Sequence, residues 1–405
     1  MMFLHFIRDG VGAMFQGGKY YRSWLVLLLI LIAIGAGFYL QQLQQGIVIT
    51  GMSDQVSWGF YIANFTFMLG IAAAVMLLLI PAYLFGREDV RHVVLIGHAM
   101  AVAAVFTAML LVIVDLGRPD RMWHLLPLFG DINLPQSMLA WDVVSLNGFL
   151  LLNLITPFYI LYRHYQGKPA LPKHYLPVIV LTILWAVFMT TVEAMLFATN
   201  SGRPLWHTPL LGPRLLASAF VSGPALIIIV LLLIRRFWQY PVKQSAIDLL
   251  SIILVYALYM NLFIVFMELL IDFYNETTHA ASLRYLFFGL HGYTGLTTWI
   301  WLALIFNTLA MILLSFNQYR QNIRILIFAC SLSVLGIWIE KGMGFVVAGF
   351  IPTPIGEIYE YFPTFAEIMI TLGCWAIGAL VFTLLSRATT TLETRTYSHT
   401  ASYNP

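Results

Sequence analysis

Long apolar runs dominate the chain, and short polar connections separate them. A helix needs about 20 predominantly apolar residues to cross a membrane. Ten runs meet that condition, at 24–43, 57–85, 91–115, 138–162, 174–198, 214–237, 247–272, 285–314, 323–349 and 365–386. The pattern therefore predicts an all-α, polytopic membrane protein with about ten transmembrane helices. The short polar tail at 387–405 is expected to be disordered.

The composition supports this prediction and excludes several other classes of protein. Of the 405 residues, 60% are hydrophobic and only 10% are charged, whereas soluble domains carry roughly 25% charged residues. The formal net charge of +3, without a basic block, is too small to indicate nucleic-acid binding. Cys330 and Cys374 both lie in apolar runs, which excludes a disulfide framework, a cysteine-ligated iron–sulfur cluster and a covalently attached c-type haem.

The distribution of basic residues predicts the orientation of the chain. With ten spans both termini lie on one side, and 15 of the 21 lysines and arginines fall on that side. These are Arg8, Lys19, Arg22, Arg87, Arg91, Arg163, Lys168, Lys173, Arg235, Arg236, Lys243, Arg320, Arg324, Arg387 and Arg395. Basic loops mark the cytoplasm, so we expect a cytoplasmic-membrane protein with both termini, including residues 1–23, on the cytoplasmic side.

Several ionisable residues lie inside the predicted spans, where they are costly and therefore candidates for function. Seven of them map to the outer third of the membrane: Asp115, Asp142, Glu193, Glu268, His291, Glu340 and Glu367. His98 alone lies deeper, nearer the cytoplasmic half. A simpler interpretation is that acidic groups near helix ends, such as Glu340 and Glu367, only contact interfacial water, and that His98 is a hydrogen-bonded core histidine.

The chain also contains a weak internal repeat. Shifts of 147 to 153 residues superpose ionisable groups at equivalent depths: Asp115 with Glu268, Asp142 with His291, and Glu193 with Glu340. The shift of 153 residues also matches Gly70 with Gly223. Four spans separate the copies, so both run in the same direction. We expect two four-helix bundles, at 57–198 and 199–349, flanked by a first helix within 24–56 and a tenth within 350–386.

Motifs in the outer loops resemble those of a known family. Asp115-Leu-Gly-Arg-Pro119, Ser137-Met-Leu-Ala-Trp-Asp142, Gly202-Arg-Pro-Leu-Trp-His-Thr-Pro209 and Tyr361-Phe-Pro-Thr-Phe-Ala-Glu367 occur in the order and topology found in the NrfD/PsrC-type membrane subunits of respiratory enzymes. The likeness covers helices two to ten. It is greatest to the ten-helix subunits of sulfur-metabolism complexes, the DsrP type above all, with the HmcC and HybB types as near alternatives.

The resemblance implies a quinone-reactive subunit without its own haem or iron–sulfur cluster. Such subunits bind a ferredoxin-like iron–sulfur protein on the periplasmic face and exchange electrons between its clusters and menaquinone or ubiquinone. In the DsrP type, a c-type cytochrome and further membrane or cytoplasmic redox subunits complete the complex.

Quinone chemistry and the buried charges indicate the same region. Exchange between quinone and quinol moves two electrons and two protons, so it needs proton acceptors and hydrogen-bonding groups beside the ring. The expected quinone-site residues among helices two to four are Tyr61, Asn64, Asp115, Arg118, Trp141 and Asp142. Proton transfer is assigned to Asp115, Asp142, Glu193, Glu268, His291 and Glu340, and His98 is a hypothetical member of a path toward the cytoplasm.

Three alternatives remain open from the sequence. A passive anchor for extrinsic redox subunits would carry the same outer loops. A secondary transporter would also have repeats and buried charges, but its site would lie at the midplane. A b-type cytochrome would require paired histidines at similar depth, and His98 has no obvious mate.

Overall fold

The protein was analysed as a computed structural model, which describes residues 1–125, 129–275 and 278–401. These residues form an all-helical molecule in which ten helices are long and apolar enough to cross a membrane. Among the described residues the only strand-like pairing is an isolated bridge between Leu290 and Tyr293. The predicted fold class, an all-α polytopic membrane protein, is confirmed.

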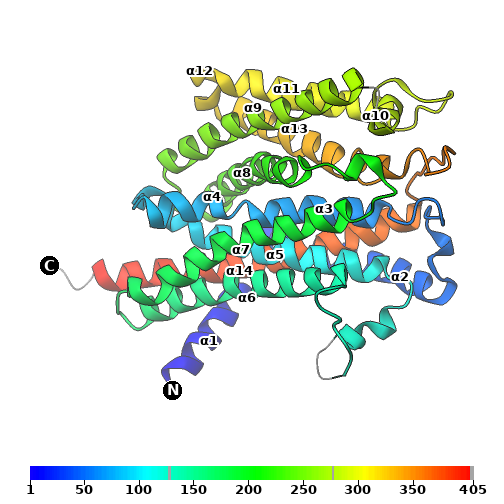
Figure 1. The fold of residues 1–405 in the computed structure, drawn as a ribbon. Helices are drawn as coiled ribbons and strands as arrows, with labels where there is room; N and C mark the ends of the chain where they lie inside the picture. The colour runs from blue at the N-terminus through cyan, green and yellow to red at the C-terminus, as the bar shows by residue number, and fades with distance from the viewer. Residues whose placement is uncertain (126–128, 276–277, 402–405) are drawn as a thin grey trace.

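The helices run roughly parallel to one another, and both termini lie toward the same end of the molecule (Figure 1). The α-helices are α1 Met2–Met14, α2 Lys19–Gln45, α3 Phe60–Ala73, α4 Met76–Leu79, α5 Glu88–Asp115, α6 Met138–Tyr165, α7 Pro172–Ala198, α8 Leu211–Trp238, α9 Gln244–Asn275, α10 Thr278–Phe288, α11 Thr297–Ser315, α12 Asn317–Gln321, α13 Ile323–Lys341 and α14 Phe365–Ala401. Short 3₁₀ turns occupy Ile47–Ile49, Pro119–Leu125, Pro204–Trp206 and Ala348–Phe350, and a π-helical turn occupies Ile80–Leu84.

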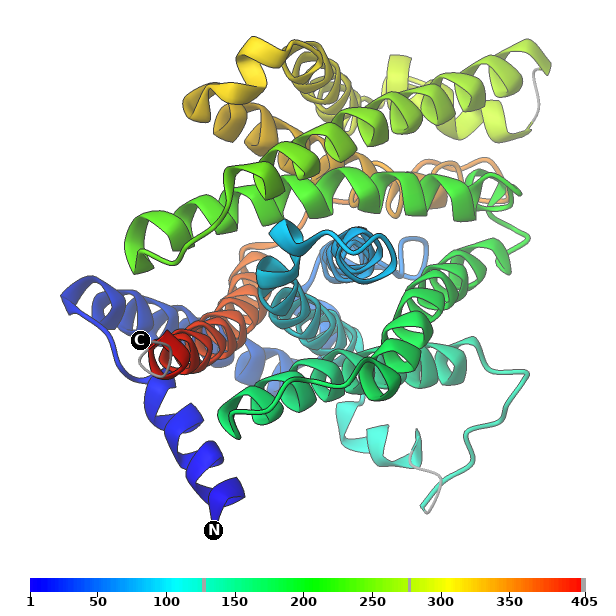
Figure 2. The same cartoon turned by 90° about the vertical axis from the view of Figure 1, so that its left-hand side faces the viewer.

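Helix contacts divide most of these elements into two rings of four. In the first ring α3 packs on α5, α5 on α6, α6 on α7, and α7 on α3. In the second ring α8 packs on α9, α9 on α11, α11 on α13, and α13 on α8. Viewed along the helices, the second ring lies above the first, while α2 and α14 lie beside the first (Figure 2). We propose that these rings are the two copies of the repeat.

Small residues allow the two bundles to approach closely where α3 crosses α8. A Cβ atom added to Gly223 of α8 would lie 1.9 Å from Cβ of Ala74, which follows α3. One added to Gly70 of α3 would lie 3.5 Å from Ala219 of α8. Small residues at helix interfaces let backbones pack at short range in membranes. Gly70 and Gly223, which the sequence matched to each other in the expected repeat, thus both lie at the seam between the two bundles.

Three predicted spans differ in detail from the observed helices. The span predicted at 57–85 is interrupted after Ala73 and ends in the π-helical turn that contains Pro81. The span predicted at 285–314 is two helices, α10 and α11, because Gly289 and Gly292 adopt positive φ angles and turn the chain. The span predicted at 323–349 ends at Lys341. Hydropathy registers apolar side chains and not backbone turns, which explains these errors.

The tail expected to be disordered is helical over its described part, because α14 continues to Ala401. Leu392 packs with Phe6 of α1, and Glu393 accepts a hydrogen bond from Tyr240. These contacts hold the end of α14 against the body of the protein. Helix α1 was not predicted as a separate element.

Candidate functional site

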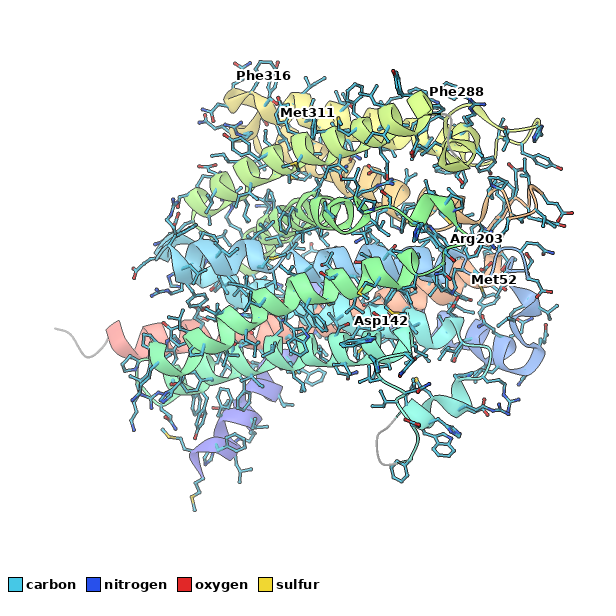
Figure 3. All side chains as sticks on the ribbon, viewed as in Figure 1. Met52, Asp142, Arg203, Phe288, Met311 and Phe316 are labelled. Atoms are coloured by element: carbon cyan, nitrogen blue, oxygen red, sulfur yellow. The ribbon has the colours of Figure 1, made fainter. Side chains whose placement is uncertain are left out.

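Asp142 lies within the first bundle, near the start of α6. Ser137 caps that helix by accepting a hydrogen bond from the Ala140 amide, and Asp142 follows one turn later. Figure 3 places Asp142 inside the bundle, toward the end of the molecule where Arg203 and Met52 lie. The residue is 3% exposed, and its Oδ1 atom is buried without a hydrogen-bond partner among the described residues. Glu193 on α7 is a neighbouring ionisable group.

Glu193 forms an ion pair that connects the two bundles. Lys341, the last residue of α13, places its Nζ atom 3.1 Å from Oε1 of Glu193, and both side chains are at most 2% exposed. The Lys341 carbonyl also accepts a hydrogen bond from Thr66 of α3 at 3.4 Å. A buried charge is tolerated only when it is paired. Lys341 was not predicted as a site residue, although a lysine within an apolar run could have identified it as a candidate.

Asp115 is the last residue of α5 and faces a second polar cluster. Its Oδ1 atom is buried without a hydrogen-bond partner among the described residues, and its charge interacts with that of Glu367 on α14. Glu367 accepts hydrogen bonds from the Tyr361 hydroxyl at 2.6 Å and from the Gly51 amide at 2.8 Å. Burial, with the nearby Glu367 carboxylate, raises the pKa of Tyr361 above its usual value, so its hydroxyl remains a donor.

Tyr61 and Asn64 on α3 are buried beside these clusters, but both are already hydrogen-bonded. The Tyr61 hydroxyl donates to Oε1 of Gln42 on α2 at 2.7 Å, and Gln42 donates to the carbonyl of Val114 at 2.6 Å. Asn64 accepts a hydrogen bond from the Trp338 indole at 2.9 Å. Tyr61 therefore supports the end of α5 through Gln42, which the sequence could not reveal because Gln42 belongs to a flanking helix.

Arg118 and Trp141 lie closer to the surface than the aspartates. The Arg118 side chain is 67% exposed and pairs with Asp120 at 3.1 Å. The Trp141 indole donates to the Pro135 carbonyl at 2.9 Å. These two side chains thus border the loop between α5 and α6, of which residues 126–128 lie outside the described part of the chain.

The carboxylates of the second bundle have protein partners. Glu268 of α9 accepts a hydrogen bond from Nη1 of Arg214 on α8 at 2.7 Å. Glu340 of α13 accepts hydrogen bonds from Asn307 at 2.9 Å and from Asn261 at 3.3 Å. Arg214 and the two asparagines were not predicted. Their side chains neutralise Glu268 or solvate Glu340, the two residues that the expected repeat matches to Asp115 and Glu193.

The two histidines assigned to proton transfer differ from the carboxylates in position. His291 lies in an exposed turn between α10 and α11 and has a φ of 51°, so the structure does not place it in the buried layer. His98 of α5 is fully buried. Its Nδ1 atom lies 2.8 Å from Oδ1 of Asn153, while Nε2 is buried without a partner in the described residues.

The structure therefore divides the predicted site residues into two buried groups of the first bundle and one of the second. The Glu193–Lys341 ion pair is the group that neighbours Asp142, and the Glu367 cluster is the corresponding group for Asp115. Among the described residues, neither aspartate is hydrogen-bonded to its neighbouring group. Within residues 1–125, 129–275 and 278–401, no three His, Cys, Asp or Glu side chains gather closely enough to hold a metal ion.

Comparison with known proteins identifies relatives over most of the chain. The chain is 27% identical to a putative dimethyl sulfoxide reductase membrane subunit of Halobacterium salinarum over 89% of both chains. It is 22% identical to the Hdr-like menaquinol oxidoreductase integral membrane subunit of Archaeoglobus fulgidus, over 89% of this chain and 91% of the relative. It is also 22% identical to a selenate reductase subunit of Mesobacillus selenatarsenatis, over 90% and 92% of the two chains.

These relatives do not support the narrower prediction of the DsrP type, because their names designate subunits of other oxidoreductases. The broader prediction is confirmed. The profile of the family described as "Polysulphide reductase, NrfD" matches residues 48–348, and the chain belongs to that family of integral membrane subunits.

Proposed function

We propose that this chain is the quinone-interacting membrane subunit of a respiratory oxidoreductase, and that Asp115 and Asp142 are its proton-transfer groups. The observation that carries the proposal is that each aspartate keeps one buried carboxylate oxygen without a protein partner in the described residues. Such an oxygen is available to a ligand or a proton. The family and its relatives support a membrane subunit of an oxidoreductase, and one relative is named for menaquinol.

The two aspartates suit the proton exchange that a quinone requires. Menaquinone or ubiquinone supplies a two-electron, two-proton couple when it binds. In the quinol-oxidising direction Asp115 and Asp142 accept the two protons, and in the opposite direction they donate them. Lys341 neutralises Glu193. A change in the charge of Asp142 therefore acts on a neighbouring ion pair.

The partners follow from the same proposal. The two electrons pass to or from an extrinsic iron–sulfur subunit of ferredoxin type on the face that carries Arg118 and the 199–210 connection. Because most basic loop residues fall at the opposite end, we assign that opposite end, with both termini, to the cytoplasm. A c-type cytochrome and further redox subunits are candidate members of the complex.

The test is quinol-linked turnover of the assembled complex in membranes. Asp115→Asn and Asp142→Asn should each lower turnover by about 10²-fold or more, since general acid–base groups contribute roughly 10²–10⁴-fold. Asp248→Asn is the matched control, because Asp248 lies near the start of α9, at the opposite end of the molecule, where it accepts an exposed hydrogen bond from Gln244. It should leave turnover within about threefold of the unchanged protein.

Complex assembly is measured in the same membranes by co-purification of the partner subunits. Normal assembly with lost turnover supports the proposal. Normal assembly with retained turnover in both Asp115→Asn and Asp142→Asn would favour a passive anchor for extrinsic redox subunits and overturn the assignment.

A further inference from the structure

A cavity of about 180 Å³ lies between α1 and the ends of α5, α6 and α14, away from the carboxylate clusters. Its lining is apolar except for Asn153 and Thr389. An engineered cavity of about 150 Å³ with an apolar lining stays dry and binds small hydrocarbons. The cavity near α1 is large enough for a segment of a hydrocarbon chain, and it has few polar groups that could hydrogen-bond to water.

A proline and two partly exposed apolar side chains of α6 line this space. Pro157 lies inside α6 and lines the cavity, and a proline within a helix removes a backbone hydrogen bond and bends the helix. Leu154 and Phe158, on the same stretch of α6, also line the cavity but remain 39% and 43% exposed. The cavity wall is therefore reached from the lipid-facing surface of the protein.

Helix α1 covers this space as an interfacial helix. Its 13 residues extend about 20 Å at 1.5 Å per residue, which is too short to span a bilayer. Phe6, Gly10 and Ala13 are buried, whereas Leu4 and Val11 are 71% and 48% exposed. A short helix with apolar residues exposed in this way lies at the boundary between headgroups and hydrocarbon chains, and Figure 1 shows it projecting beside α6.

We propose that this cavity binds one hydrocarbon chain of an anionic phospholipid, whose phosphate contacts Arg8. Arg8 follows Ile7, which lines the cavity, and its side chain is 74% exposed. The nearest acid, Asp9, lies 3.8 Å away and accepts a hydrogen bond from Tyr165. Basic side chains at this depth attract anionic headgroups. A quinone has an apolar tail but no charged headgroup, so Arg8 favours the phospholipid.

Native mass spectrometry of the purified protein tests the cavity. Phosphatidylglycerol is added back after delipidation, and one tightly bound molecule per chain is expected. Leu154→Trp fills the cavity and should lower bound phosphatidylglycerol at least tenfold. Leu151→Trp is the matched control, because Leu151 lies one turn away on α6, is 56% exposed and does not line the cavity. Loss of binding in both variants, or in neither, overturns the proposal.

The headgroup contact is tested by charge. Arg8→Ala should weaken phosphatidylglycerol binding about fivefold, the usual effect of one basic side chain at an anionic surface, and Arg8→Lys should restore most of it. Phosphatidylcholine with the same chains should bind more weakly to the unchanged protein. Equal binding of both lipids would contradict the role of Arg8.

Photo-crosslinking of the unchanged protein in nanodiscs avoids any folding defect of the variants. Phosphatidylglycerol with a diazirine in its acyl chain should label peptides of α1, α6 and α14 more strongly than peptides of the lipid-facing helices of the second bundle. Uniform labelling of all lipid-facing helices, or preferential labelling of α1 by a diazirine quinone analogue, would overturn the proposal.

Discussion

The two four-helix bundles share an arrangement of helices but differ in how they accommodate buried carboxylates. In the second bundle Glu268 is paired with Arg214, and Glu340 is held by Asn261 and Asn307. In the first bundle Asp115 and Asp142 each keep an oxygen without a partner in the described part of the chain. A carboxylate whose oxygens all accept hydrogen bonds from the protein is held in place. A carboxylate oxygen without a donor can accept a proton or a hydrogen bond from a ligand.

We propose from this difference that the two bundles have separate roles. The second bundle carries charge in a form that stabilises structure, and it also donates Lys341 to Glu193 of the first bundle. The first bundle carries the groups that we propose for chemistry. The following variants test this contrast.

The largest effect on stability is expected from Lys341→Met. The substitution removes the cation and leaves Glu193 buried without its ionic partner, which costs about 5 kcal/mol for a fully buried pair. The measurement is the free energy of unfolding in detergent or, where unfolding is irreversible, the thermal inactivation midpoint. The double variant Lys341→Met/Glu193→Gln should regain more than half of the loss. If the single variant is as stable as the unchanged protein, the pair does not connect the bundles as described.

A smaller loss is expected from Arg214→Met in the second bundle. Glu268 loses its partner, but the pair is slightly more exposed than Lys341–Glu193, so the cost should be about 3 kcal/mol. Turnover per folded complex should stay within about threefold if the second bundle has the structural role that we propose. A loss of turnover comparable to that of Asp142→Asn, at unchanged stability, would contradict the separation of roles.

The smallest effect is expected from Tyr61→Phe. The change removes one hydroxyl and leaves Oε1 of Gln42 without its donor, which costs about 1–2 kcal/mol for a buried acceptor. Turnover should fall less than about threefold, because Tyr61 acts on Asp115 only through Gln42 and Val114. Gln42→Leu/Tyr61→Phe also leaves the Val114 carbonyl without its donor, so it should be less stable than Tyr61→Phe alone. A loss of turnover near 10²-fold would instead place Tyr61 against the quinone.

Much of the fold could be predicted because the bilayer imposes simple rules on the sequence. A spanning helix needs a long apolar run, so all ten candidate spans were found near their observed positions. His291 was misplaced because the turn around it depends on backbone angles at Gly289 and Gly292, which hydropathy does not register.

The partners within the site were harder to predict than its carboxylates. Asp115 and Asp142 could be proposed from the sequence because a charge in an apolar run is conspicuous, and the structure buries an oxygen of each. The ion pair was missed because Glu193 and Lys341 are 148 residues apart, and only the packing of α13 against the first bundle brings them together. Arg118 belongs to the same motif as Asp115 but lies at the surface, since a motif defines neighbours along the chain and not their burial.

The glycine at the seam between the bundles has a consequence for motion. With Cβ of Ala74 only 1.9 Å from where a methyl group on Gly223 would be, the two halves are interlocked backbone against backbone. Alternating access requires such halves to rock past each other, and an interlocked crossing resists that sliding. The two bundles are therefore held close together at this crossing, which fits the quinone-linked role proposed above better than it fits the movement of a solute across the bilayer.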